Sequence, residues 1–238
     1  MKVLKEYIRY YISGTLREKR EASLINQFKN LQAQKNEPEN VLRIYVRKVI
    51  LEHINEVCGS VSDDVADAIA TAQMAHLGQK RRSGEPYLTH PLEVADIVYT
   101  YYPDDPILCA AALLHDSLED ALMMGNVTSN QEMESLIAGS FGNPEVGNKA
   151  LDIVKQLTHS KGVNYSDYVQ SLSASPDVLK IKLSDMLHNL QSSPSKRQRS
   201  KYRDALDALS PSGTTPEGIS SGHWKRLMSL TQDQQYEE

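Results

Sequence analysis

Apolar residues recur every three or four positions along most of the chain, and this spacing predicts helices. In the segment 63–77, for example, Val65, Ile69 and Ala72 share one helix face. The same periodicity predicts further helices over 92–102, 106–124, 133–141, 150–158 and 176–190. No segment alternates apolar and polar residues between hairpin turns, so the expected fold class is all-α.

Polar and glycine-containing breaks divide this pattern into three parts. Residues 1–58 carry amphipathic helical patterns with an excess of lysine and arginine, residues 59–209 carry most of the predicted helices, and residues 210–238 begin with a serine-, proline- and glycine-rich stretch. We therefore expect a basic helical N-terminal extension, one compact multi-helix domain and a flexible C-terminal tail. The extension could dock on the domain, bind a partner protein or join copies into a homo-oligomer.

Composition and charge exclude several classes of protein. The chain has 238 residues, 40% of them hydrophobic, and a formal net charge of −5, so it can bury a core but lacks the basic excess of most DNA- and RNA-binding domains. Its two cysteines do not make a disulfide framework, and neither a signal peptide nor a run of eighteen apolar residues is present. We expect a cytoplasmic protein that binds neither nucleic acid nor membrane.

Four ionisable residues follow directly behind the apolar run 107–114. On a continuous helix, His115, Asp116, Glu119 and Asp120 would share one side, within an arc of about 140°. Carboxylates this close raise each other's pKa unless a cation lies among them. Since an imidazole beside a carboxylate is a common pair of metal ligands, this segment is interpreted as half of a metal site.

Two further segments carry residues suited to phosphate chemistry. The segment 75–91 is basic and contains two histidines, and in the segment 179–190 the spacings of three and four residues place Lys182, Asp185 and Asn189 on one helix face. These segments offer the cations and the additional ligands that the acidic segment lacks.

Together the three segments resemble the hydrolase domain of the RelA/SpoT homologues, within the HD phosphohydrolase superfamily. The matching blocks read AHLGQKRRSGEPYLTHPLEVA, AALLHDSLEDA and KLSDMLHNL, and the resemblance covers about residues 63–192. It implies a compact HD-type helical domain that removes the 3′-pyrophosphate from (p)ppGpp-type alarmones, giving GDP or GTP and pyrophosphate. Because no synthetase domain fits in the remaining length, the chain looks like a stand-alone small alarmone hydrolase.

The resemblance also implies roles for individual residues. The implied ligands of one divalent metal, Mn²⁺ in this family, are His90, His115, Asp116 and Asp185. Glu119 and Asp120 are implied to position and deprotonate the attacking water. The implied substrate-binding residues are Arg81, Arg82, Ser83, Lys182 and Asn189.

Alternatives remain open at single residues. Asp185 could form a buried ion pair with Lys182 instead of binding a metal. His76 is interpreted as a packing residue or a partner of a ligand, and His188 as a structural residue on another helix face. His159 and His223 receive no role.

Three alternative functions also remain. The chain could be another HD-family nucleotide phosphohydrolase, or a hydrolase of adenosine alarmones that acts as the antitoxin to a toxic alarmone synthetase. It could also be a non-catalytic module that binds an alarmone or a protein. Glu119 and Asp120 argue against such a module, because they would be an electrostatic burden without benefit to a simple binder.

Overall fold

The computed structural model describes residues 63–103, 105–159, 162–192 and 194–232. The described residues form helices and no strand, which confirms the all-α fold class. The helices predicted in the extension 1–58 lie outside the described residues. Within the described part, no helix is both long enough and apolar enough to cross a lipid bilayer.

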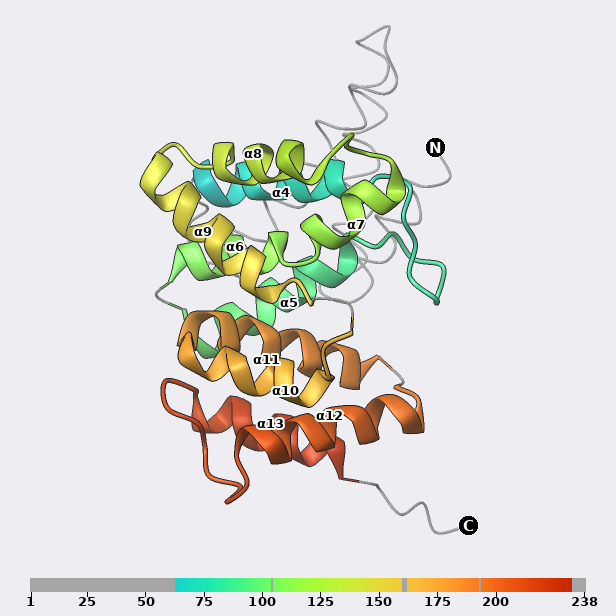
Figure 1. The fold of residues 1–238 in the computed structure, drawn as a ribbon, viewed down its shortest axis with the longest axis vertical. Coiled ribbons are helices and arrows are strands. Elements are labelled where there is room, and N and C mark those ends of the chain that lie inside the picture. The colour runs from blue at the N-terminus through green and yellow to red at the C-terminus, as the bar shows by residue number, and fades with distance from the viewer. Residues whose placement is uncertain (1–62, 104, 160–161, 193, 233–238) are drawn as a thin grey trace, which may run out of the picture. The chain divides into compact units, whose positions relative to one another are not determined.

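Most of the helices follow one another along the chain with short connections, and longer segments join α4 to α5 and α12 to α13 (Figure 1). They are α4 (Asp63–Ala75), α5 (Thr89–Tyr101), α6 (Pro106–Leu114), α7 (Ser117–Met124), α8 (Asn130–Gly139), α9 (Pro144–Leu157), α10 (Tyr165–Ser171), the short 3-10 helix η1 (Leu172–Ala174), α11 (Pro176–Gln191), α12 (Lys196–Leu209) and α13 (Ser221–Thr231).

Local sequence explains where several of these helices begin. A side-chain oxygen of the capping residue accepts a backbone N–H from the first turn of α6, α8, α9, α10 and α12, and α6, α9 and α11 begin with proline. The capping residues are Asp105, Ser129, Asn143, Asn164 and Ser195. Such caps satisfy N–H groups that have no partner within the helix.

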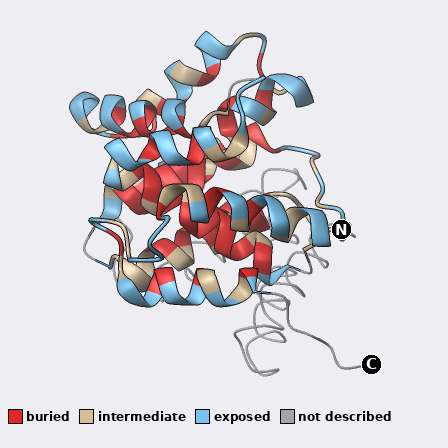
Figure 2. Cartoon of the chain, turned by 60° about the horizontal axis from the view of Figure 1, so that its bottom comes forward, coloured by how far each residue is buried: buried red, intermediate tan, exposed pale blue. Residues whose placement is uncertain are grey.

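The core of the helical unit is built around α6 and α11. Every residue from Leu108 to Leu114 is buried, and α11 buries residues over most of its circumference. α6 packs against α4, α5 and α9, whereas α11 packs against α5, α9 and α13. Figure 2 shows the buried residues where helices face one another and the exposed residues on the outward faces of the helices. Each fully buried leucine or isoleucine contributes about 1.5–3 kcal/mol, so α6 and α11 form a firm support for polar residues near their ends.

The structure interrupts one helix that the sequence predicts as continuous. The periodicity predicts a helix over 106–124, but α6 ends at Leu114 and α7 begins at Ser117. Asp116, with φ −97° and ψ −2°, precedes α7, and its carbonyl oxygen accepts the first two backbone hydrogen bonds of that helix. The side-chain hydrogen bond that usually favours aspartate at an N-cap does not explain this break. The side chain of Asp116 makes no capping hydrogen bond.

The expectation of a flexible tail from residue 210 is wrong for residues 221–231, which form α13. This helix packs against α11 and α12 and buries His223, Trp224 and Leu227. The indole Nε1 of Trp224 donates to the carbonyl oxygen of Gly213 at 3.2 Å. The serine- and proline-rich composition therefore marks only the loop before α13, because apolar residues at helical spacing anchor the segment that follows.

Residues 78–87 form a compact loop with its own hydrogen bonds. The Arg81 N–H donates to the carbonyl oxygen of Glu85 at 2.8 Å, and the Gly84 N–H donates to that of Arg81 at 2.9 Å. Gly84 has a φ of +91°, in the left-handed region that glycine adopts without strain. Ser83 Oγ donates to Glu85 Oε2 at 3.1 Å, so the loop is a hydrogen-bonded turn.

Candidate metal centre

The four predicted metal ligands come together from three parts of the helical unit. His90 lies in the first turn of α5, His115 and Asp116 occupy the junction between α6 and α7, and Asp185 lies on α11. One potential ligand atom from each of His90, His115 and Asp185 lies within 4.8 Å of the others, and all three residues are buried. Donors that share one ion at about 2 Å lie up to roughly 4 Å apart, so small side-chain shifts would let this group hold a metal.

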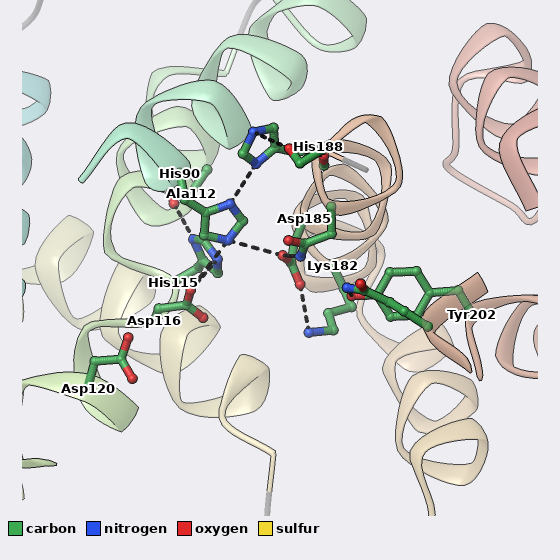
Figure 3. A network of polar contacts seen from close by, with 12 residues as sticks. His90, Ala112, His115, Asp116, Asp120, Lys182, Asp185, His188 and Tyr202 are labelled. Atoms are coloured by element: carbon green, nitrogen blue, oxygen red, sulfur yellow. Dashed lines mark hydrogen bonds and ion pairs between the residues drawn. The ribbon is translucent and has the colours of Figure 1, made fainter. Parts of the chain in front are cut away.

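The individual distances place Asp116 in the same group. Asp116 Oδ2 lies 3.0 Å from His115 Nε2 and 3.4 Å from His90 Nε2. On the other side, Asp185 Oδ1 lies 3.2 Å from His90 Nε2. Figure 3 shows the two imidazoles between the two carboxylates. Two nitrogen and two oxygen donors therefore converge on one point.

The tautomer of His115 directs a lone pair at this point, where a proton or a cation would be stabilised. Its Nδ1 lies 2.8 Å from the carbonyl oxygen of Ala112, which only accepts, so Nδ1 carries a hydrogen. In the neutral ring, Nε2 then presents a lone pair. This atom is buried and has no hydrogen bond of good geometry within the described part of the chain, although Asp116 Oδ2 is close. A lone pair facing a carboxylate is unfavourable unless a proton or a cation lies between them.

The pKa values of His115, Asp116 and Asp185 show that this site stabilises positive charge next to two carboxylates. Burial lowers the pKa of His115, but interactions led by the charge of Asp116 outweigh burial and raise this pKa to about 9. Without a metal, a proton on Nε2 therefore supplies the positive charge at neutral pH. Burial raises the pKa of Asp116, and the charge of His115 more than offsets it, so that pKa falls well below its usual range. The pKa of Asp185 is also lowered, because the charge of Lys182 outweighs burial. Both carboxylates are therefore ionised at neutral pH.

Asp185 engages Lys182 and the histidine group at the same time. Lys182 Nζ lies 2.9 Å from Asp185 Oδ2, while Oδ1 accepts from Asn189 Nδ2 at 2.5 Å and faces His90. The ion pair and the proposed metal ligation, treated as alternatives from sequence, thus use different oxygens. Burial lowers the pKa of Lys182, but Asp185 raises it well above the usual value, so this lysine stays charged.

The two predicted catalytic carboxylates lie in the first turn of α7. Glu119 Oε1 accepts the backbone N–H of His159 at 2.7 Å. Partial burial and the charge of Asp116 raise the pKa of Glu119, against a smaller lowering by the His159 N–H. Asp120 Oδ2 lies 3.7 Å from Nδ1 of the buried His76, and Figure 3 shows Asp120 to one side of the converging donors.

Three tyrosines that the sequence did not single out lie beside Lys182. The ammonium group is 5.8 Å from the ring centroid of Tyr165 and 5.7 Å from that of Tyr168, and Tyr202 stacks on Tyr165 with centroids 5.8 Å apart. Lys201 Nζ lies 3.8 Å from the Tyr165 centroid. The spacing of three between Tyr165 and Tyr168 was the available signal for this aromatic cluster, which lies on α10 and α12.

His188, interpreted from the sequence as a structural residue, lies against the proposed ligand His90. Its Nδ1 lies 2.6 Å from Nδ1 of His90, and the two rings stack with centroids 4.9 Å apart. Both residues are buried. The spacing of three from Asp185 to His188 was the signal that could have placed it beside a proposed ligand. The predicted substrate residues Arg81, Arg82 and Ser83 belong to the loop 78–87 described above, where Arg82 and Ser83 are exposed.

The chain is similar to known proteins over most of its helical part. A family model described as HD domain matches residues 68–211. A probable GTP pyrophosphokinase of Mycobacterium leprae is 35% identical over 155 residues, which is 62% of this chain and 18% of that protein. The bifunctional (p)ppGpp synthase/hydrolase SpoT of Escherichia coli K12 is 35% identical over 150 residues, which is 60% of this chain and 20% of that protein.

A protein of Escherichia coli O157:H7 named guanosine-3′,5′-bis(diphosphate) 3′-pyrophosphohydrolase has the same identity and coverage as SpoT. The chain therefore spans about a fifth of the length of these relatives. The resemblance to RelA/SpoT homologues that three sequence blocks indicate is confirmed. Because the family model covers more than half of the 238 residues and includes all four predicted ligands, the chain belongs to the HD domain family.

Proposed function

We propose that this protein is a divalent-metal-dependent hydrolase of guanosine alarmones. In the proposed reaction, a water oxygen bonds to the phosphorus attached to the 3′-oxygen, the bond from that phosphorus to the 3′-oxygen breaks, and the 3′-oxygen takes up a proton. The products are GDP or GTP and pyrophosphate. The observation that carries the proposal is the convergence of two imidazoles and two ionised carboxylates on one buried point.

The proposed metal ligands are His90, His115, Asp116 and Asp185. A divalent ion bound there would polarise a phosphate oxygen and lower the pKa of a coordinated water. Mixed nitrogen and oxygen donors suit Mn²⁺, which we propose as the metal. The Ala112 carbonyl holds His115 with its lone pair directed at the site, and Asn189 and Lys182 hold the carboxylate of Asp185.

Glu119 is the proposed general base. Burial raises its pKa and so brings it closer to the working pH, and a carboxylate of this kind can accept the proton of the attacking water. The N–H of His159 fixes one of its oxygens. Asp120, held beside His76, is proposed to orient the water.

Positive charge is the proposed means of holding the nucleotide phosphates. Lys182 remains charged beside the metal centre, and Arg81 and Arg82 are proposed to grip the leaving pyrophosphate, because a guanidinium group can donate two parallel hydrogen bonds to phosphate oxygens. Ser83 and Asn189 are the other proposed substrate residues. The printed names of two relatives, which include (p)ppGpp hydrolysis, support guanosine alarmones as the substrate class.

A substrate panel tests this proposal. The purified chain would be incubated with Mn²⁺ and guanosine 3′,5′-bispyrophosphate, its adenosine analogue, or a deoxynucleoside triphosphate, and the products separated by chromatography. We expect GDP and pyrophosphate from the first substrate at the highest rate. Faster turnover of the adenosine analogue would replace guanosine by adenosine alarmones, and turnover of the deoxynucleotide alone would indicate another HD phosphohydrolase. Tight alarmone binding without turnover would indicate a binding module.

A further inference from the structure

We propose that His188 and Ser192 form a hydrogen-bonded relay that keeps Nε2 of His90 free of hydrogen, so that His90 is ready to bind a metal. His188 would then be a positioning residue, acting through His90 and not on substrate. This inference rests on the proposed metal centre. The relay joins His90 of α5, His188 of α11 and Ser192, the residue that follows α11.

The relay is a continuous line of short contacts. Nδ1 of His90 and Nδ1 of His188 are 2.6 Å apart, and Nε2 of His188 lies 3.3 Å from Ser192 Oγ. Ser192 Oγ also donates to the carbonyl oxygen of His188 at 3.0 Å. Figure 3 shows His90 between His188 on one side and the carboxylates on the other.

The hydrogens of this line can be assigned from one end. The carbonyl oxygen of His188 only accepts, so the single hydroxyl hydrogen of Ser192 is directed to it. Ser192 Oγ must then accept from Nε2–H of His188, which leaves Nδ1 of His188 with a lone pair. Two ring nitrogens 2.6 Å apart need one hydrogen between them, and that hydrogen therefore belongs to Nδ1 of His90. In neutral His90, Nε2 carries the lone pair.

The relay opposes a competing arrangement. Nε2 of His90 faces Asp185 Oδ1 at 3.2 Å and Asp116 Oδ2 at 3.4 Å, and these ionised oxygens would favour a hydrogen on Nε2. A ring in that tautomer would have no lone pair for a metal. The acceptor on His188 favours the metal-binding tautomer instead, as the partner on the second nitrogen of a metal-binding histidine commonly does.

Burial makes the choice of tautomer consequential. Only 3% of His90 and 7% of His188 is exposed, so water cannot readily replace a lost partner. The rings also stack at an angle of 23°. A purely structural role would need only this stacking, whereas the relay needs an acceptor at the position of Nδ1. The two roles therefore make different predictions for substitutions of similar size.

The test uses the full chain with His188→Asn, His188→Leu and Ser192→Ala, and with Ser229→Ala as a control. Ser229 Oγ likewise donates to a backbone carbonyl, on the exposed side of α13. Asparagine keeps an acceptor near the position of Nδ1, whereas leucine does not. We expect calorimetric titration with Mn²⁺ to show about 10–100-fold weaker binding in His188→Leu, a smaller loss in Ser192→Ala, and substantial recovery in His188→Asn.

The second readout is the nitrogen-15 NMR spectrum of histidine-labelled, metal-free protein. We expect hydrogen on Nδ1 of His90 in the wild type and in His188→Asn, and on Nε2 in His188→Leu. Unchanged Mn²⁺ affinity and an unchanged His90 tautomer in His188→Leu would overturn the relay. So would equal losses in the folded asparagine and leucine variants. If the wild type failed to bind Mn²⁺, the proposed function would fail, but the spectrum would still decide the tautomer.

Discussion

At the scale of single residues, Asp185 links the metal centre to a buried cation. One oxygen faces His90 and accepts from Asn189, while the other lies 2.9 Å from Lys182 Nζ. In the metal-free protein, Lys182 is the principal positive charge that compensates this buried carboxylate. A bound divalent ion would supply a second one.

Lys182→Met is therefore expected to destabilise the metal-free protein more than the Mn²⁺-loaded protein. Removing one partner of a buried ion pair costs about 3–5 kcal/mol, because it leaves an uncompensated charge. The measurement is the free energy of unfolding in denaturant with Mn²⁺ and with a chelator. An equal loss of stability under both conditions would contradict ligation by Asp185.

Glu119→Gln is expected to lower kcat by about 10²–10⁴-fold and to leave Mn²⁺ affinity close to wild type. The raised pKa of Glu119 also predicts an acidic limb in the pH profile of kcat, because the base must be unprotonated, and this limb should disappear in the variant. Steady-state kinetics and metal titration check both points. A variant with wild-type kcat would exclude Glu119 as the base.

His159→Ala is the matched control for Glu119. The Glu119 carboxylate is held by the backbone N–H of His159, while the His159 ring contacts the carbonyl oxygen of Val163 at 3.0 Å. We expect kcat and Mn²⁺ affinity to be unchanged, since alanine keeps the backbone donor. A fall in kcat similar to that of Glu119→Gln would show that the ring itself takes part.

At the scale of helices, close packing between α8 and α9 depends on one glycine. A Cβ atom on Gly147 would overlap the carbonyl oxygen of Ala138, whereas one on Gly139 would meet nothing within 4 Å. We expect Gly147→Ala to lower the free energy of unfolding by about 1–3 kcal/mol, as overpacking does, and Gly139→Ala to cause no loss. Chemical denaturation distinguishes them. Equal stability of the two variants would contradict this packing.

The junction of α13 with the core predicts a pH dependence of stability. His223 is fully buried, accompanied by Tyr101 at a centroid distance of 4.6 Å and by the Tyr102 hydroxyl at 3.0 Å, and burial lowers its pKa from 6.5 to about 4. Between these values the unfolded chain binds more protons than the folded chain. Above pH 6.5 His223 is neutral in both states and does not lower the free energy of unfolding. As the pH falls from 6.5 toward 4, protonation of the unfolded chain lowers this free energy by up to about 3 kcal/mol.

Denaturation of the wild type and His223→Phe at pH 7 and pH 4 measures this contribution. We expect the wild type to lose about 3 kcal/mol more than the variant between the two pH values, because phenylalanine cannot titrate. Phenylalanine is chosen because its ring can still stack on Tyr101 as the imidazole does. The same pH dependence in both proteins would contradict a neutral, buried His223.

At the scale of the whole molecule, the sequence predicts the fold class better than it predicts the contacts between residues. His115 and Asp116 stand out in the sequence because an imidazole and a carboxylate behind an apolar run are costly to bury without a cation. His90 and Asp185 are predicted as ligands only by the resemblance to the RelA/SpoT homologues. The break between α6 and α7 cannot be recognised in the sequence, because Leu114 and Ser117 continue the helical periodicity. Only the backbone of Asp116 interrupts the helix. The helix α13 was hidden by the linker-like composition that precedes it.

Contacts between distant helices account for the rest of what the sequence leaves open. His188 meets His90 across 98 positions, and the tautomer of His115 depends on a backbone carbonyl that any residue at position 112 would supply. The pairing of His188 with His90 follows from how α5 and α11 pack, not from local spacing. The tyrosines beside Lys182 come from α10 and α12, which the periodicity did not mark as helices.

The central claim is that His90, His115, Asp116 and Asp185 form one metal centre that hydrolyses a guanosine alarmone. The most direct measurement is pyrophosphate release from guanosine 3′,5′-bispyrophosphate as Mn²⁺ is titrated into metal-free wild type and Asp116→Ala. We predict activity that rises to saturation in the wild type, and neither tight Mn²⁺ binding nor turnover in the folded variant. Turnover that needs no metal, or that survives unchanged in Asp116→Ala, would contradict the account.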